Sequence, residues 1–158
     1  MFFVDTSALV KAYLEEPGSE AVREIVRQRR KSVYVSNHVA LETLASFASN
    51  LRRQVIRPRR YRRARSEFLR DYPGTWNIVE VSPQTVDDAM QLTDVHRGLG
   101  VGGMDLLHIA TAEQLAKTRG TTPTIVCADR AMRNLAAAAG FRVFNPETDD
   151  PITLAAGG

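Results

Sequence analysis

The sequence predicts an α/β fold in which a mostly parallel central sheet is flanked by helices. Short apolar segments that favour strands alternate along the chain with longer segments whose apolar residues recur at helical spacing. The strand segments are almost continuously apolar, as expected for a parallel sheet covered on both faces. The length of 158 residues, without an internal repeat or a long linker, indicates one compact domain.

The first part of the chain is predicted to contain two strands and two helices. The expected elements are a strand over 2–4, a helix over 6–16, a helix over 19–31 and a strand over 33–35. Thr6 or Ser7 can cap the first helix, and Pro17 with Gly18 ends it. The second strand is β-branched and aromatic, which favours extended backbone.

Two consecutive helices are predicted next, and they interrupt the alternation as a helical-pair insertion. Ser36 and Asn37 are expected to cap the first of them, which runs to about Arg53. Its expected core residues are Ala40, Leu44, Phe47 and Leu51. The second helix covers 58–72 and has one apolar stripe, whereas its other faces are nearly all arginine.

The remainder returns to alternating strands and helices. The expected elements are a strand over 77–81, helices over 82–97 and 104–119, a strand over 124–128, a helix over 130–139 and a strand over 141–144. Val86, Ala89 and Met90 are expected to face inward, and the helix over 104–119 is apolar on most sides and therefore central. We expect a single domain over residues 1–146 and a C-terminal tail over 147–158.

Composition limits the class of protein. With 44% hydrophobic residues the chain can build a core, and its single cysteine, Cys127, excludes an internal disulfide framework. No stretch approaches the roughly 20 apolar residues that a membrane-spanning helix needs. The start of the chain also lacks the pattern of a cleaved signal peptide. The sequence therefore predicts a cytoplasmic protein that is not associated with a membrane.

Four acidic residues lie where apolar segments meet predicted helices. Asp5 and Asp129 each end a strand segment, Glu42 lies one turn into a helix, and Asp105 follows a glycine-rich turn. Because the carboxyl ends of parallel strands share one edge of a sheet, such acids can meet in one crevice. Several carboxylate oxygens in one place suit Mg²⁺ or Mn²⁺.

Each acid has a simpler interpretation as a helix cap or as a favourable charge in a first helical turn. Asp105 fits this interpretation least, because it begins a helix that is predicted to be buried, where an unpaired charge is costly. The chain has only three lysines, and its arginines cluster elsewhere. A divalent metal ion would satisfy several of these carboxylates at once.

The motifs around these acids resemble those of PIN-domain ribonucleases, especially the VapC-type toxins of bacterial toxin–antitoxin pairs. The similar segments are Val4-Asp5-Thr6-Ser7-Ala8-Leu9, Ser36-Asn37-His38-Val39-Ala40-Leu41-Glu42, Gly103-Met104-Asp105-Leu106-Leu107-His108-Ile109-Ala110 and Val126-Cys127-Ala128-Asp129-Arg130. They occur in the family's order and cover nearly the whole chain. One departure is Cys127, at a position where the family often has Thr or Ser, and a thiol is a weaker hydrogen-bond donor than a hydroxyl.

The resemblance implies a PIN-like three-layer fold and an endoribonuclease that depends on Mg²⁺ or Mn²⁺. It implies that Asp5, Glu42, Asp105 and Asp129 are the catalytic, metal-holding residues. Thr6 or Ser7 would hold Asp5 or contact phosphate. The resemblance also implies an RNA substrate, a homodimer and a cognate antitoxin protein that neutralises the toxin.

The arginine-rich helix has two interpretations. Nine arginines and one acid, Glu67, lie between Arg52 and Arg70. Such a run is often a solvated helix face, but it can also guide a polyanion toward the acids by contacting phosphate groups. We expect RNA contacts from Arg59, Arg60, Arg62 and Arg63. An antitoxin segment could use the same surface.

The histidines and two other classes of protein offer alternatives to this hypothesis. His108 lies on the same helix face as Asp105, and we expect it to be a core residue or a residue that supports the acids, with His38 near a helix cap. An aspartyl-phosphate phosphatase is disfavoured, because its nucleophile normally has a second Asp two residues on, where this chain has Ser7. A PIN module that binds RNA or a protein without cutting remains an alternative.

Overall fold

The computed structural model describes residues 1–151, which form a five-stranded sheet and seven α-helices. The strands are β1 (Phe2–Val4), β2 (Val33–Ser36), β3 (Asn77–Val79), β4 (Thr124–Val126) and β5 (Arg142–Phe144). The helices are α1 (Thr6–Tyr13), α2 (Ser19–Arg29), α3 (Val39–Arg52), α4 (Pro58–Thr75), α5 (Pro83–Val95), α6 (Gly103–Arg119) and α7 (Arg130–Ala138). A short 3₁₀ helix, η1 (Arg30–Ser32), joins α2 to β2.

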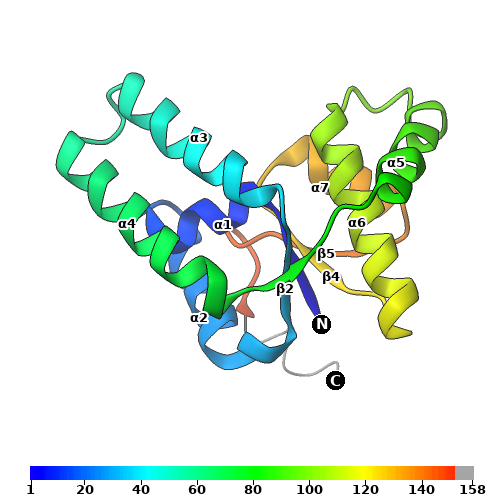
Figure 1. The fold of residues 1–158 in the computed structure, drawn as a ribbon, viewed down its shortest axis with the longest axis horizontal. Coiled ribbons are helices and arrows are strands. Elements are labelled where there is room, and N and C mark those ends of the chain that lie inside the picture. The colour runs from blue at the N-terminus through cyan, green and yellow to red at the C-terminus, as the bar shows by residue number, and fades with distance from the viewer. Residues whose placement is uncertain (152–158) are drawn as a thin grey trace.

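The sheet has the order β3-β2-β1-β4-β5, and every pair of neighbouring strands is parallel. The first strand of the chain is therefore the central strand, with Phe2 opposite both Val33 and Thr124. Helices α1 to α4 lie on one side of the sheet and α5 to α7 on the other (Figure 1). The predicted three-layer α/β fold is thus confirmed. Because all strands run the same way, their carboxyl ends share one edge.

Each face of the sheet has its own hydrophobic core. Phe3 and Ile125 point toward α6 and α7, where Ile109 and Met132 are fully buried. Val4 points to the opposite face, where it joins the cluster that α1 and the helical pair build. Alternate residues of one short strand thus serve two cores, as the pleat of a strand requires.

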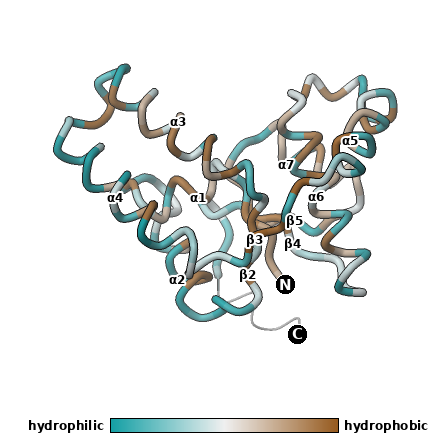
Figure 2. The backbone as a smooth tube through the Cα atoms, viewed as in Figure 1, coloured by the Kyte–Doolittle hydropathy of each residue, from teal (hydrophilic) through white to brown (hydrophobic). Residues whose placement is uncertain are grey.

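The helical pair α3–α4 extends away from the sheet (Figure 1). Its base is fixed by the rings of Phe47 and Phe68, which pack edge-on against each other and against Tyr13 of α1. The Trp76 indole donates a hydrogen bond of 3.0 Å to the Tyr13 hydroxyl. The outward surface of α4 is mostly hydrophilic (Figure 2). The insertion therefore presents its arginines while its apolar stripe docks on α1.

Several predicted details are wrong. Ser36 belongs to β2, and Asn37 accepts a hydrogen bond from the backbone N–H of Val81, so neither caps α3, whose cap residue is His38. Helix α4 continues through Pro73 to Thr75, so the predicted end at Tyr72 is too early.

On α5 only Ala89 of the three residues expected to face inward is buried, whereas Val86 is 43% and Met90 is 64% exposed. The apolar residues at helical spacing on α5 thus include exposed as well as buried side chains. Among residues 1–151, no helix is both long and apolar enough to cross a membrane.

The segment after β5 is anchored to the start of the fold. The backbone of Pro146 lies so close to Gly18 that a Cβ atom there would be 2.6 Å from the Pro146 carbonyl oxygen. The ammonium group of Lys11, whose side chain is 5% exposed, lies 2.8 Å from the Glu147 carboxylate and 3.3 Å from that of Glu16. The tail expected from residue 147 thus begins with ordered contacts, and its part over 152–158 lies outside the described residues.

Candidate active site

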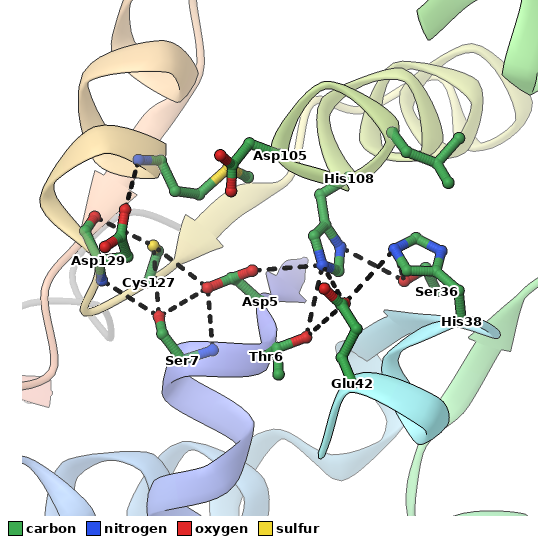
Figure 3. Close-up of polar contacts among 12 residues, drawn as sticks. Asp5, Thr6, Ser7, Ser36, His38, Glu42, Asp105, His108, Cys127 and Asp129 are labelled. Atoms are coloured by element: carbon green, nitrogen blue, oxygen red, sulfur yellow. Dashed lines mark hydrogen bonds and ion pairs between the residues drawn. The ribbon is translucent and has the colours of Figure 1, made fainter. Parts of the chain in front are cut away.

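Two of the predicted acids end neighbouring strands and cap the helices that follow. Asp5 follows β1 and caps α1, and its carboxylate accepts a hydrogen bond of 3.0 Å from the Ser7 backbone N–H. Asp129 follows β4 and caps α7, accepting 2.8 Å from the Met132 backbone N–H. Asp5 is buried and Asp129 is exposed. Both therefore act as helix caps, and the pairing of β1 with β4 also brings them to one edge (Figure 3).

The Ser7 hydroxyl connects these two acids. It donates a hydrogen bond of 2.6 Å to Oδ2 of Asp5. The same oxygen accepts from the backbone N–H groups of Ala128 and Asp129, at 3.0 Å and 3.1 Å. Ser7 thus fixes the Asp5 carboxylate to the loop that carries Asp129.

Cys127 lies at the base of the same network. Its Sγ is 3.4 Å from both Oδ2 of Asp5 and the Asp129 carbonyl oxygen. Burial, together with the charge of Asp5, raises the pKa of this thiol well above its ordinary range. Cys127 is therefore a protonated thiol and a weak hydrogen-bond donor to Asp5.

Asp105 begins α6 and faces the same edge from the other side of the sheet (Figure 3). Its carboxylate accepts a hydrogen bond of 2.8 Å from the Gly102 backbone N–H. Burial first, and then the charges of Asp5 and Asp129, raise the pKa of Asp105 despite that hydrogen bond. Three carboxylates are thus close enough to repel one another, which is a setting that a cation stabilises.

Glu42 reaches the site from α3. Its Oε2 accepts hydrogen bonds from the Thr6 hydroxyl at 2.7 Å and from Nε2 of His108 at 2.9 Å. Burial alone would raise the pKa of Glu42. The hydrogen bonds from His108 and Thr6, together with the electrostatic effect of His108 and His38, lower this pKa overall. Glu42 is therefore held as a carboxylate.

His108 occupies the space between Glu42 and Asp5, as Figure 3 shows. Its side chain is 1% exposed, and Nε2 lies 3.4 Å from Oδ1 of Asp5. Burial would lower the pKa of His108, but the hydrogen bond to Glu42 and the charges of Asp5 and Asp105 outweigh it and raise the pKa. The sequence offered no lysine or arginine as a buried partner for these acids, and the structure provides an imidazole.

The contacts of Ser36 with two histidine rings of the site were not predicted from the sequence. Its hydroxyl lies 3.3 Å from Nδ1 of His108 and 3.2 Å from Nε2 of His38. It can accept from the first ring and donate to the second, which fixes both. The position of Ser36 at the carboxyl end of a strand, like that of Asp5, is a signal that could have placed it here.

The four arginines expected to contact RNA differ in their surroundings. Arg60 donates a hydrogen bond of 2.8 Å to the Tyr13 carbonyl oxygen, and Arg63 pairs with Glu67 at 2.7 Å. The side chains of Arg59 and Arg62 are exposed and form no hydrogen bond or ion pair within residues 1–151. Within that range none of the four arginines pairs with any of the four acids.

Comparison with known proteins agrees with this architecture. The family model for the PIN domain matches residues 2–138. No curated protein matches the chain closely enough to count as a relative.

Solved structures share the fold at low sequence identity. FitAcB from Neisseria gonorrhoeae is 18% identical, with a TM-score of 0.64 over 94% of this chain and 100% of that chain. VapC20 from Mycobacterium tuberculosis, described as a toxin that cleaves the sarcin–ricin loop, is 20% identical, with a TM-score of 0.63 over 89% and 96%. VapBC2 from Rickettsia felis, bound to a DNA fragment from its promoter, is 16% identical, with a TM-score of 0.62 over 91% and 97%.

Proposed function

Because the chain belongs to the PIN domain family, we propose that it is a divalent-metal-dependent endoribonuclease and the toxin of a toxin–antitoxin pair. The observation that carries this proposal is the arrival of four carboxylates, separated widely in the sequence, at one edge of the sheet. They come from the end of β1, the first turn of α3, the start of α6 and the end of β4. Four independent helix caps would not need to lie at one edge of the sheet, whereas the carboxylates of a nuclease site must lie together.

The donor set fits a hard metal ion. Asp5, Glu42, Asp105 and Asp129 offer carboxylate oxygens, and the raised pKa of Asp105 marks an excess of negative charge that a cation would relieve. We propose that these four residues hold Mg²⁺ or Mn²⁺, directly or through water. When bound, such an ion would lower the pKa of a water molecule and neutralise charge on the scissile phosphate.

The surrounding side chains position the carboxylates. Ser7 fixes Asp5 through a hydrogen bond of 2.6 Å, and Thr6 fixes Glu42 through one of 2.7 Å. We propose that water, rather than the RNA 2′-hydroxyl, attacks phosphorus, with a carboxylate accepting its proton. The cleaved RNA then carries no 2′,3′-cyclic phosphate.

The proposed role implies partners. VapC20 is named as a toxin, and a toxin–antitoxin complex from Klebsiella pneumoniae has the same fold, with a TM-score of 0.61. By analogy we propose that this chain forms a homodimer and is neutralised by an antitoxin protein in the cytoplasm. We propose that the exposed side chains of Arg59 and Arg62 bind phosphate groups of RNA.

A second candidate is a PIN module that binds RNA or a protein without cutting it. The observation in its favour is His108, whose Nε2 lies 3.4 Å from Asp5 and 2.9 Å from Glu42 and whose pKa is raised by these carboxylates. An acidic site neutralised in this way can be stable without a metal ion.

Cleavage of RNA by the purified chain separates the two candidates. We expect Mg²⁺-dependent cleavage that is lost in chelator and in Asp5→Asn and Asp105→Asn. Because asparagine can still cap α1, loss of cleavage in Asp5→Asn would report the missing carboxylate and not a missing helix cap. Asp87→Asn, on the exposed surface of α5, is the matched control and should cut normally. Cleavage that persists in chelator would refute the metal dependence, and folded wild-type protein that binds but never cuts RNA would favour the second candidate.

The toxin role needs a test in cells. Expression of the wild type should arrest growth and create new RNA ends, whereas Asp5→Asn should do neither. Wild-type expression without growth arrest would overturn the toxin role even if the purified chain cuts RNA.

A further inference from the structure

The histidines beside the acidic cluster form a group of a different chemical character. His38, Glu42 and His108 each place one ligand atom within 4.8 Å of those of the other two. The set consists of two imidazole nitrogens and one carboxylate oxygen. Two histidines and a glutamate are a ligand set typical of zinc sites that keep an open fourth position. Hard ions such as Mg²⁺ prefer oxygen ligands alone.

We propose that His38, Glu42 and His108 form a second metal site, which takes Zn²⁺ and shares Glu42 with the acidic cluster. The spacing of the ligand atoms supports this assignment. Nε2 of His108 lies 2.9 Å from Oε2 of Glu42, and Nε2 of His38 lies 3.7 Å from the same oxygen. In a tetrahedral site with bonds of about 2.0–2.1 Å, ligand atoms are about 3.3 Å apart, which lies between these two distances.

The backbone fixes two of the three ligands relative to each other. His38 caps α3 and Glu42 lies four residues later, so both project from one side of the first helical turn. His108 comes from α6 on the other side of the sheet, and its ring centroid is 4.4 Å from that of His38. The site therefore depends on tertiary structure, and an unfolded chain would not present it.

A hydrogen bond orients the His108 ring. Nδ1 of His108 lies 3.3 Å from the Ser36 hydroxyl, which leaves Nε2 directed at Glu42. A second ring nitrogen bonded to a neighbouring polar group is the usual support for a zinc-binding histidine. For His38 it is Nε2 that lies 3.2 Å from this hydroxyl, and its Nδ1 is buried and has no partner among residues 1–151. A metal ion bound at Nε2 of His38 would therefore replace its contact with Ser36.

The ligand chemistry makes the site selective. The side chains of His108, His38 and Glu42 are 1%, 14% and 24% exposed, so the three ligands are largely shielded from solvent. Zn²⁺ binds imidazole far more strongly than Mg²⁺ does. An ion held here would occupy Oε2 of Glu42, and Zn²⁺ would therefore compete with the proposed Mg²⁺ site for this carboxylate.

Binding of Co²⁺, a spectroscopic substitute for Zn²⁺, tests the site without RNA. Titration of the folded full chain should give the visible absorption of four-coordinate Co²⁺, with one ion for each chain and displacement by Zn²⁺. His38→Asn should raise the Kd at least tenfold. Asp105→Asn, which abolishes the proposed cleavage, and His96→Asn, a histidine outside the cluster, should leave the Kd unchanged. The two proposals can therefore fail separately.

Two results would overturn the second site. One is an unchanged Kd in His38→Asn, and the other is loss of Co²⁺ binding in Asp105→Asn, which would assign the ion to the acids. Should His38→Asn fail to fold, X-ray absorption at the zinc edge of the wild-type protein decides instead. Two imidazole ligands are expected, and a shell of oxygen ligands alone would refute the site.

Discussion

Nε2 of His108 lies 2.9 Å from Oε2 of Glu42, although 66 residues separate them in the chain. This pair joins α6 to α3 across the carboxyl edge of the sheet, and its imidazole also faces Asp5. The raised pKa of His108 favours a protonated ring, which offsets negative charge that would otherwise repel in a buried place. The pair is therefore an electrostatic contact on which both the fold and the site depend.

This pair makes the stability of the metal-free protein depend on pH. The pKa of His108 is raised in the folded state, so its stabilising contribution is complete below its unfolded pKa of about 6.5. The contribution is lost as pH rises through the higher folded pKa. Each unit of the shift corresponds to about 1.4 kcal/mol. We expect the free energy of unfolding of the wild type to exceed that of His108→Asn most at pH 6.5, and by less toward pH 9.

Urea denaturation in the presence of chelator measures this difference. His96→Asn serves as the control, and its difference from the wild type should not vary over the same pH range. His38, whose pKa is lowered to about 4 by burial and by His108, stays neutral there. A difference between wild type and His108→Asn that is constant with pH would show that the imidazole is uncharged.

The Cys127 thiol should resist chemical modification. It is fully buried, and burial together with Asp5 raises its pKa, so the reactive thiolate is scarce at neutral pH. We expect iodoacetamide at pH 8 to label the native protein at least about 100-fold more slowly than the urea-unfolded protein. Mass spectrometry after timed quenching gives both rates. Rapid labelling of the native chain would mean that this end of β4 opens to solvent.

Arginines of α4 should separate into two groups in RNA binding. Changing Arg59 and Arg62 to Ser removes exposed charges that bond to nothing else in residues 1–151, so RNA affinity should fall while stability is unchanged. The slope of log affinity against log salt should decrease by about 0.7 for each RNA phosphate that the variant no longer neutralises. Fluorescence anisotropy at several salt concentrations measures both quantities.

Arg60→Ser provides the contrast. It removes the hydrogen bond to the Tyr13 carbonyl oxygen and should cost about 1 kcal/mol of stability, with little change in the salt slope. If Arg59 and Arg62 can be replaced without any decrease in RNA affinity, α4 presents a solvated face instead of an RNA-binding surface.

Gly18 and Gly140 offer a matched pair for the contact between the α1–α2 turn and the segment after β5. Both have φ +85°, but only at Gly18 would a Cβ atom meet the Pro146 backbone. Alanine at either site costs about 1–2 kcal/mol for the left-handed conformation. We expect Gly18→Ala to lower the free energy of unfolding by clearly more than Gly140→Ala, because the Pro146 backbone must also move. Equal decreases would show that the two segments separate easily.

Local patterns predicted the elements well, since each depends on neighbours in sequence. Pro58 at the start of α4 and Gly140 after α7 are signals of this kind. The convergence of the acids also followed from the sequence, once parallel strands were predicted, because strand ends share an edge.

Features that depend on contacts between distant elements were not predictable. The spacing of Val86 and Met90 describes a helix face but cannot tell which neighbour covers it, and both are exposed. His108 was expected to be a core residue or to support the acids, but its place between Glu42 and Asp5 requires α3 and α6 to meet. The Ser36 hydroxyl contacts both His38 and His108 only because α3 and α6 lie close together.

The central position of β1 has a consequence for synthesis of the protein. The strand neighbour of β1, β4, with Asp129, is made more than a hundred residues after Asp5. Domains fold as units as the chain emerges, so a growing chain lacks a complete acidic cluster until β4 and α7 have joined β1. A ribosome that is making this protein is thus exposed to an assembled site only after β4 and α7 have been synthesised.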